Sequence, residues 1–251
     1  MQNPNELSIL IATDNHLGYM ENDPIRGNDS LNSFEEILQI AKDRQVDMIL
    51  LAGDLYHDNK PSRKTTYKSM ALLREYCLGS RPSSLAFMSD QSDVFLDQFA
   101  KANYLDPNYN VSIPVFSIHG NHDDPSGDGK YCALDLLSVT GLVNYFGKCS
   151  DVDDITIKPI LLSKGKTNLA LYGLGNVRDE RLNRTFRRGN VKIVRPETDS
   201  WFNILAIHQN RVPRGVKNYI PELFLEDFLD LVVWVYTINL GTRTRLFNRS
   251  S

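Results

Sequence analysis

Four apolar segments of this chain are each followed directly by residues that can bind a metal ion. The segments cover residues 8–13, 46–52, 111–119 and 203–207, and each has the length and composition of a buried β-strand. The polar residues after them include Asp14, Asp54, Asn121 and His208. Because the carboxyl ends of parallel strands lie along one edge of a sheet, residues far apart in the sequence can meet there. The pattern predicts an α/β fold with one functional edge.

Helical patterns separate the strand-like segments. Residues 33–36 have the spacing of a capping box, and apolar residues recur at helical intervals after them, so we predict a helix that starts near Ser33. A second helix is predicted over residues 66–78, with an apolar face formed by Tyr67, Met70, Ala71 and Leu73. A strand, a helix and a parallel strand form a right-handed βαβ unit. Later in the chain we expect helices at 133–139 and 179–188, a helical turn at 221–228, and strands at 154–162, 168–172 and 230–234.

The composition is typical of a single globular domain. The chain has 251 residues, of which 41% are hydrophobic, and no repeat or convincing domain boundary interrupts it. Helical and strand periodicity weakens over residues 79–110, which form either a partner-binding insertion or a decorated surface loop. The apolar runs are far shorter than the roughly 18 residues of a membrane helix, and no secretory signal is recognisable. We therefore expect an intracellular protein that spans no membrane, with reduced thiols at Cys77, Cys132 and Cys149.

The charge balance does not by itself indicate a polyanion-binding protein. There are 28 Lys and Arg residues against 31 Asp and Glu, which gives a formal net charge of -3. Any binding to nucleic acid must therefore use metal ions or a local patch of positive charge. One basic segment could contact a phosphate backbone, although its helical spacing is also that of a solvated helix face: Arg178, Arg181, Arg184, Arg187, Arg188, Lys192 and Arg195.

The residues after the four segments combine oxygen and imidazole ligands, a mixture that suits Mn²⁺, Fe or Zn²⁺ better than calcium: Asp14, His16, Asp54, Asn121 and His208. A carboxylate on a tight Gly-Asp turn, as at Asp54, can bridge two ions about 3.5–4 Å apart and so clamp a phosphate ester. His122 is next to a ligand and can face the substrate. Each short motif alone also occurs by chance or as a plain turn, so the inference rests on their shared order and placement.

These motifs resemble those of the calcineurin-like metallophosphoesterase superfamily. Five longer strings resemble one family within it, the meiotic-recombination-eleven nucleases of double-strand-break repair: DNHLG at 14–18, GDLYHDNKPSR at 53–63, SIHGNHDDP at 117–125, LYGLG at 171–175 and IHQNR at 207–211. The resemblance extends from about Leu7 to Trp234. It implies a sandwich of mixed β-sheets flanked by helices, incomplete at its C-terminal end, with residues 1–234 as the nuclease domain and 79–110 as an insertion.

The resemblance also implies a set of roles and partners. Asp14, His16, Asp54, Asn121 and His208 would bind two Mn²⁺ ions with Asp54 as the bridge, His122 would assist at the scissile phosphate, and His57 would help to position DNA. From its place at the end of the strand-like segment 111–119, we expect His119 to support the turn. The helices at 66–78 and 133–139 would form a homodimer interface, and residues 79–110 would bind a nibrin-type regulatory subunit. A coiled-coil ABC-type ATPase would contact mainly segments C-terminal to this chain. The implied location is the nucleus, in repair and meiosis.

The sequence departs from the family after Trp234. Family members continue with a Gly-His-x-His motif that supplies one ligand to each metal, whereas this chain has a divergent tail at residues 235–251 and no histidine after His208. A translated intron, a frameshift or an alternative transcript would explain the change, and a natural divergent terminus is the alternative. Residues 232–238 have high β propensity and no charge, so we expect an aggregation-prone open edge there and poor solubility. The loss of one ligand per ion predicts weak binding of metal.

Two functions from different classes remain open. The first is a Mn²⁺-dependent DNA phosphodiesterase with 3′ to 5′ exonuclease and endonuclease activity, which the five ligands present favour. The second is a catalytically silent, truncated form that dimerises and binds the nibrin-type subunit, which the two missing ligands favour. A phosphatase acting on another phosphoester is a weaker alternative within the enzyme class, because the ligand set does not specify DNA.

Overall fold

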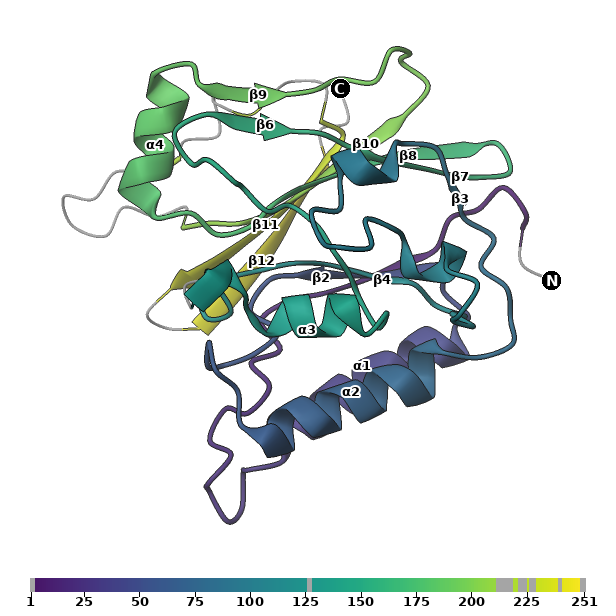
Figure 1. The fold of residues 1–251 in the computed structure, drawn as a ribbon, viewed down its shortest axis with the longest axis vertical. Helices are drawn as coiled ribbons and strands as arrows, with labels where there is room; N and C mark the ends of the chain where they lie inside the picture. The colour runs from purple at the N-terminus through teal and green to yellow at the C-terminus, as the bar shows by residue number, and fades with distance from the viewer. Residues whose placement is uncertain are drawn as a thin grey trace.

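Two β-sheets stack face to face, with helices on the outer side of each (Figure 1). The fold was obtained as a computed structural model, which describes residues 3–125, 128–210, 219–220, 225, 229–238 and 241–248. The first sheet has four parallel strands in the order β1-β2-β4-β5: β1 (Ile9–Ala12), β2 (Met48–Ala52), β4 (Val115–Ile118) and β5 (Asn144–Tyr145). Its outer face is covered by α1 (Asp29–Asp43), α2 (Arg63–Cys77) and α3 (Ala133–Val139).

The second sheet is mixed, with the order β12-β11-β10-β8-β7-β3. Its strands are β3 (Ala86–Phe87), β7 (Ile160–Lys164), β8 (Thr167–Leu174), β10 (Phe202–His208), β11 (Leu231–Ile238) and β12 (Gly241–Asn248). The central strands β8, β10 and β11 are parallel, and the pairs toward both edges are antiparallel. Outside this sheet lie α4 (Asp179–Arg187) and a two-stranded ribbon of β6 (Ile155–Ile157) and β9 (Val191–Ile193) (Figure 1). Short 3-10 helices occur at Gln91–Asp93, Asn103–Leu105 and Asp128–Lys130.

The strands alternate between two apolar layers. In β2, Ile49 and Leu51 pack under the helices, whereas Met48, Leu50 and Ala52 pack between the two sheets. In β10, alternate residues likewise face the other sheet or α4. Because both faces of these strands are buried, the sequence shows continuous apolar runs instead of an alternation of polar and apolar residues. The predicted α/β sandwich of mixed sheets flanked by helices is confirmed.

The predicted start of the first helix is wrong. The helix begins at Asp29, and Ser33 lies exposed within it instead of capping it. The earlier start allows Leu31 to join Phe34 and Leu38 on the buried face, and the free energy of burying an additional leucine outweighs the absence of a side-chain cap at Asn28.

The second helix also differs from its prediction. It begins at Arg63, after Ser62 caps it by accepting a hydrogen bond from the Thr65 amide at 3.1 Å. The sequence pattern places Tyr67 on the apolar face, but 70% of its surface is exposed. Leu73 is buried and Met70 packs against the core, as predicted, and the buried face also includes Thr65, Ser69, Tyr76 and Cys77.

Proline divides or shortens two of the predicted strands. Residues 154–162 form two strands, β6 and β7, which belong to different sheets, and Pro159 lies between them. The predicted strand at 111–119 is reduced to β4, which begins directly after Pro114. A proline has no amide hydrogen to donate to a ladder, so it lies at a strand's start or outside it. The short strands β3, β5, β9 and β12 were not predicted.

The expected open edge at residues 232–238 is also wrong. Strand β11 continues to Ile238 and pairs along its whole length with β12, from Leu231 opposite Asn248 to Ile238 opposite Gly241. Residues 235–238 and 241–248 of the divergent tail therefore extend the sheet, and the basis for expecting aggregation at β11 is removed. The predicted helical turn at 221–228 lies outside the described residues, apart from Leu225.

The segment at 79–110 is built into the sandwich. Strand β3 pairs with β7 at the edge of the second sheet, and Leu85, Phe95 and Ala102 pack in the layer between the sheets. Four large apolar side chains of the same segment remain exposed, at 60% for Met88, 57% for Leu96, 59% for Phe99 and 39% for Leu105. Among the described residues, no helix has the length and apolar character needed to cross a membrane.

Candidate metal centre

The ends of β1, β2, β4 and β10 bring the predicted ligands to one edge of the sandwich. Asp14 and Asp54 follow β1 and β2, and His208 is the last residue of β10 in the other sheet. Ligand atoms of these three residues lie within 4.8 Å of one another. His16 adjoins them, because its Nε2 is 3.7 Å from Asp14 Oδ1 and 3.8 Å from Asp54 Oδ2. The site is therefore formed by both sheets.

The backbone at these residues is held in an uncommon conformation. Asp14, His16 and Asp54 have φ values of 51°, 46° and 50°, in the left-handed region that residues other than glycine rarely adopt. Hydrogen bonds between the two loops maintain it: the amides of Asp14 and His16 donate to the carbonyl oxygens of Gly53 and Asp54, at 3.1 and 3.0 Å. Such local strain is concentrated at functional sites, where the surrounding structure compensates for its cost.

Two glycines of the motifs make room for the ligands. A Cβ atom on Gly53 would lie 2.4 Å from His208 Nδ1, and one on Gly120 would lie 2.1 Å from Asp54 Oδ1. Both distances are far below van der Waals contact, so a side chain at either position would displace a ligand. Gly53 is therefore required to leave room for the His208 ring and not only to form a turn.

The charges of the cluster are coupled. Burial acts to raise the pKa of Asp54, but contacts with His208, the His122 amide and His16 outweigh it and lower that pKa. Burial also acts to lower the pKa of His208, and Asp54 outweighs it and raises that pKa. Burial dominates at the other two residues, where it raises the pKa of Asp14 and lowers that of His16.

Three buried atoms of the cluster have no hydrogen-bond partner: Asp14 Oδ1, Asp54 Oδ2 and His208 Nε2. Buried polar atoms are nearly always hydrogen-bonded in folded proteins. Three neighbouring atoms that could each bind a metal and have no hydrogen-bond partner therefore require an explanation. The His208 ring is oriented by a 3.1 Å contact between Nδ1 and the Ala52 carbonyl oxygen. Because a carbonyl oxygen only accepts, Nδ1 carries a proton, and in the neutral ring Nε2 therefore presents a lone pair. This set of oxygen and nitrogen atoms fits a divalent transition-metal ion.

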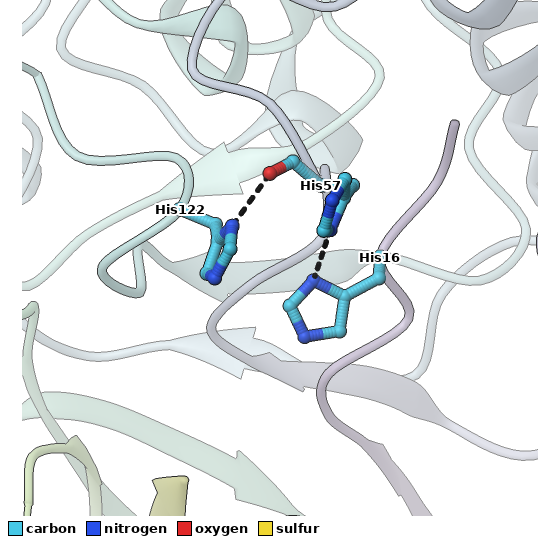
Figure 2. Close-up of side chains that lie close together, drawn as sticks. All are labelled: His16, His57 and His122. Atoms are coloured by element: carbon cyan, nitrogen blue, oxygen red, sulfur yellow. Dashed lines mark hydrogen bonds between the residues drawn. The ribbon is translucent and has the colours of Figure 1, made fainter. Parts of the chain in front are cut away.

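A group of three histidines lies beside this cluster (Figure 2). His57 and His122 are stacked, with ring centroids 5.0 Å apart, and His57 Nδ1 is 3.4 Å from His16 Nδ1. His122 Nδ1 donates to the His57 carbonyl oxygen at 2.6 Å, which leaves its Nε2 available. The ring of Tyr19 packs edge-on against His57, with centroids 4.9 Å apart. The imidazoles are therefore held beside the metal-binding atoms.

The loop after β4 carries the remaining predicted residues. The His122 amide donates to Asp54 Oδ1 at 2.8 Å, and Asn121 precedes it with an exposed side chain. His119, expected to support the turn, is buried; its Nδ1 is 2.7 Å from the Tyr145 hydroxyl and its Nε2 is 3.3 Å from the Asn176 carbonyl oxygen. These contacts agree with a supporting role.

Sequence reasoning missed two residues that contact the site. Asp123 is completely buried below the loop, and burial together with Asp54 raises its pKa to about 6. Its position in the string at 117–125 was the available signal. Asn176, which follows β8, donates to the His208 carbonyl oxygen at 3.1 Å, and no sequence pattern pointed to it.

The basic segment lies along α4 and beyond it. Arg181 pairs with Asp153 at 2.8 Å, and the Arg187 side chain donates to Asn183 at 2.9 Å. Arg178, Arg184 and Arg188 are exposed, so a contact with phosphate and a solvated face both stay open. The three cysteines are free thiols, as predicted, with Cys77 and Cys132 buried and Cys149 partly buried.

Comparison with known proteins places these residues in context. Residues 7–234 match the calcineurin-like phosphoesterase family, the same stretch over which the motifs show their resemblance. The chain is 57% identical over 230 residues to double-strand break repair protein mus-23 of Neurospora crassa. It is 54% identical over 237 residues to double-strand break repair protein MRE11 of Homo sapiens, and 54% identical over 239 residues to MRE11 of Arabidopsis thaliana.

These alignments cover 91%, 93% and 91% of this chain, but only 31%, 34% and 33% of the three relatives. The chain therefore spans about a third of the length of the curated relatives that it matches.

Proposed function

Because the chain belongs to the calcineurin-like phosphoesterase family, we propose that it is the phosphoesterase part of a metal-dependent nuclease that acts at DNA double-strand breaks in the nucleus. One observation carries the chemistry: three unpartnered buried ligand atoms of Asp14, Asp54 and His208 face one another. The choice of DNA as substrate is supported by the similarity to relatives whose names describe double-strand break repair.

The proposed ligands are Asp14, His16, Asp54, Asn121 and His208. Asp54 suits the bridging position, since Oδ1 accepts from the His122 amide and Oδ2 is left facing Asp14 and His208. Two Mn²⁺ ions are proposed; when bound, such a pair polarises a phosphodiester and activates the attacking water.

The histidines beside the ligands act on the substrate. His122 has its Nδ1 hydrogen bonded to the His57 carbonyl oxygen, so its ring is oriented. In the imidazolium form the ring carries a second proton on Nε2, which it can transfer to the leaving 3′ oxygen while it keeps the proton on Nδ1. A correctly placed proton donor of this kind contributes about 10²–10⁴-fold to the rate. His57 stacks on His122 and positions the DNA strand next to it.

This chain has fewer histidines that could bind the metal ions than the family pattern has. The sequence contains 5 histidines, four of which lie at the site, while His119 is engaged by Tyr145 and Asn176. Residues 235–251, which stand where the family pattern has its Gly-His-x-His motif, contain none. We therefore expect these 251 residues to bind Mn²⁺ weakly or partially and to show reduced nuclease activity.

A second candidate function is a silent module for assembly. Large apolar side chains are exposed on or near the outer helices, at 70% for Tyr67, 68% for Tyr131 and 52% for Leu136. Burying such residues would stabilise a homodimer through α2 and α3. The exposed Met88, Leu96 and Phe99 of the segment at 79–110 would likewise suit a nibrin-type subunit. Contact with a coiled-coil ABC-type ATPase is proposed from the resemblance alone.

Calorimetric titration with Mn²⁺ separates the two candidates. Asp54→Ala should abolish binding because it removes the bridging carboxylate, whereas His122→Asn should retain the metal and lower cleavage of labelled DNA ends by about 10²–10⁴-fold. Asp151→Ala, at an exposed carboxylate, serves as the control.

Each result has a defined meaning. Loss of metal in His122→Asn would refute the role given to that residue. A dimer that binds no Mn²⁺ and cleaves no DNA would support the silent module. Full occupancy with robust cleavage would show that the two missing histidines are dispensable. A chain extended with the C-terminal part of the human relative provides the comparison.

A further inference from the structure

Asp123 connects the two loops that carry most of the site. Its side chain is completely buried, and its two oxygens accept hydrogen bonds from two different loops. Oδ1 accepts from the Gly120 amide at 2.6 Å, on the loop after β4. Oδ2 accepts from the Leu55 amide at 2.8 Å and, more weakly, from the Tyr56 amide at 3.4 Å, on the loop after β2.

These hydrogen bonds connect the two loops beyond the point where β2 and β4 stop pairing. The regular pairing of β2 with β4 stops at Ala52 opposite Ile118, and beyond it both chains leave the strand conformation. Asp54 then adopts φ 50°, which turns the next two amides toward the interior. Successive amides in such a turn form a small concavity that favours an anion, and the Asp123 carboxylate occupies it.

The contact is reciprocal. The Asp54 side chain binds the backbone of the loop that carries Asp123, through the His122 amide at 2.8 Å. The Asp123 side chain binds the backbone of the loop that carries Asp54, through Leu55. Each carboxylate therefore holds the other's loop, and the pairing leaves one oxygen of Asp54, Oδ2, unpartnered beside His208.

We propose that Asp123 is a positioning residue for the metal site. Asp123 and Asp54 each hold the loop that carries the other, an arrangement called the clasp below, and the clasp fixes the orientation of Asp54 Oδ2. Only a carboxylate meets the requirement, because both of its oxygens accept. An asparagine would present its NH₂ group to one of the two sets of amides in either orientation. A glutamate would place an additional methylene in a site with no exposed surface. The inference rests on the proposed metal site.

Asp123→Asn tests the clasp with a side chain of nearly equal size. Residues that orient metal ligands typically change metal affinity by about 10–100-fold when replaced, and we expect a loss of that size for Mn²⁺ by calorimetry. In the metal-free chain, amide hydrogen exchange should accelerate over residues 53–57 and 119–123.

The matched control is Asp135→Asn. Asp135 is also a buried carboxylate that accepts a backbone hydrogen bond, from the Cys132 amide at 2.8 Å, but it caps α3 instead of joining the ligand loops. The Asp135→Asn substitution should lower the unfolding midpoint in urea and leave Mn²⁺ affinity unchanged within about twofold. If Asp123→Asn also binds Mn²⁺ like the wild type, the clasp has no positioning role and the proposal is overturned.

Two further outcomes remain informative. If the wild type binds no Mn²⁺, the proposed function fails, and the exchange rates over residues 53–57 alone decide whether the clasp exists. If Asp123→Asn does not fold, exchange is measured on the wild type at the Gly120 and Leu55 amides. Strong protection of both supports the clasp, and exchange as fast as in exposed loops overturns it.

Discussion

Gly175→Ala is expected to destabilise the fold through the ring of His119. A Cβ atom at position 175 would lie 2.0 Å from His119 Cε1 and 2.3 Å from its Nδ1. Gly175 does not have a left-handed φ, so the conflict is one of space and not of backbone strain. The ring is buried and held from both sides, by the Tyr145 hydroxyl at 2.7 Å and the Asn176 carbonyl oxygen at 3.3 Å.

The size of the effect follows from these contacts. Side-chain Cβ atoms essentially never approach a heavy atom within 3.0 Å, so the ring or the backbone must move by about 1 Å or more. Overpacking of a core typically costs about 1–3 kcal/mol. Loss of one or both hydrogen bonds of His119 adds about 0.5–1.5 kcal/mol each. We therefore expect a loss of about 2–5 kcal/mol, a large part of the roughly 5–15 kcal/mol that stabilises a domain.

Urea unfolding of the metal-free chain, followed by circular dichroism, measures this loss. Gly79→Ala is the matched control, because its Cβ would meet only Ser112 Oγ, at 2.8 Å, the end of a side chain that can rotate away. Its cost should stay below about 1 kcal/mol. In a His119→Ala background the clash is gone, and Gly175→Ala should then cost less than about 0.5 kcal/mol. A Gly175→Ala chain as stable as the wild type would refute the argument.

Three further predictions concern stability and are checked by urea unfolding. Trp234→Ala should lose about 3–5 kcal/mol, because the indole is fully buried and donates to the Gln209 carbonyl oxygen at 2.9 Å; a loss below about 1 kcal/mol would contradict this. Lys164→Met should lose about 3–5 kcal/mol, because it leaves the buried Asp47 carboxylate without its cation at 2.7 Å, and adding Asp47→Leu should recover part of that loss. Burial lowers the pKa of His119 from 6.5 to about 4, so the unfolded chain binds a proton at this residue at a higher pH than the folded chain does. The free energy of unfolding should therefore fall by about 3 kcal/mol as the pH is lowered from 6.5 to 4. The raised pKa of Asp123 acts in the opposite direction, so the difference between the wild type and His119→Phe isolates the effect, and parallel pH profiles would disprove it.

Local patterns were sufficient for the longer buried strands and for grouping three of the residues that meet at the edge of the sandwich. A buried strand needs a continuous apolar run, and a parallel sheet brings strand ends to one edge, so Asp14, Asp54 and His208 could be grouped from the sequence. The strands β3, β5 and β9 have only two or three residues each and contain too few positions to show a period. The start of α1 was misplaced because burial of Leu31, and not a local cap, decides where this helix begins.

The amino-acid sequence was enough to select the residues that we propose as ligands, since ligand types and their placement after apolar runs can be read from consecutive positions. How these residues are held depends on tertiary contacts. The clasp between Asp54 and Asp123, the glycine that admits the His119 ring and the covering of β11 by β12 all join segments far apart or in different strands. Such contacts leave no local period, because a buried polar group takes whichever partner the packed chain brings within hydrogen-bonding distance.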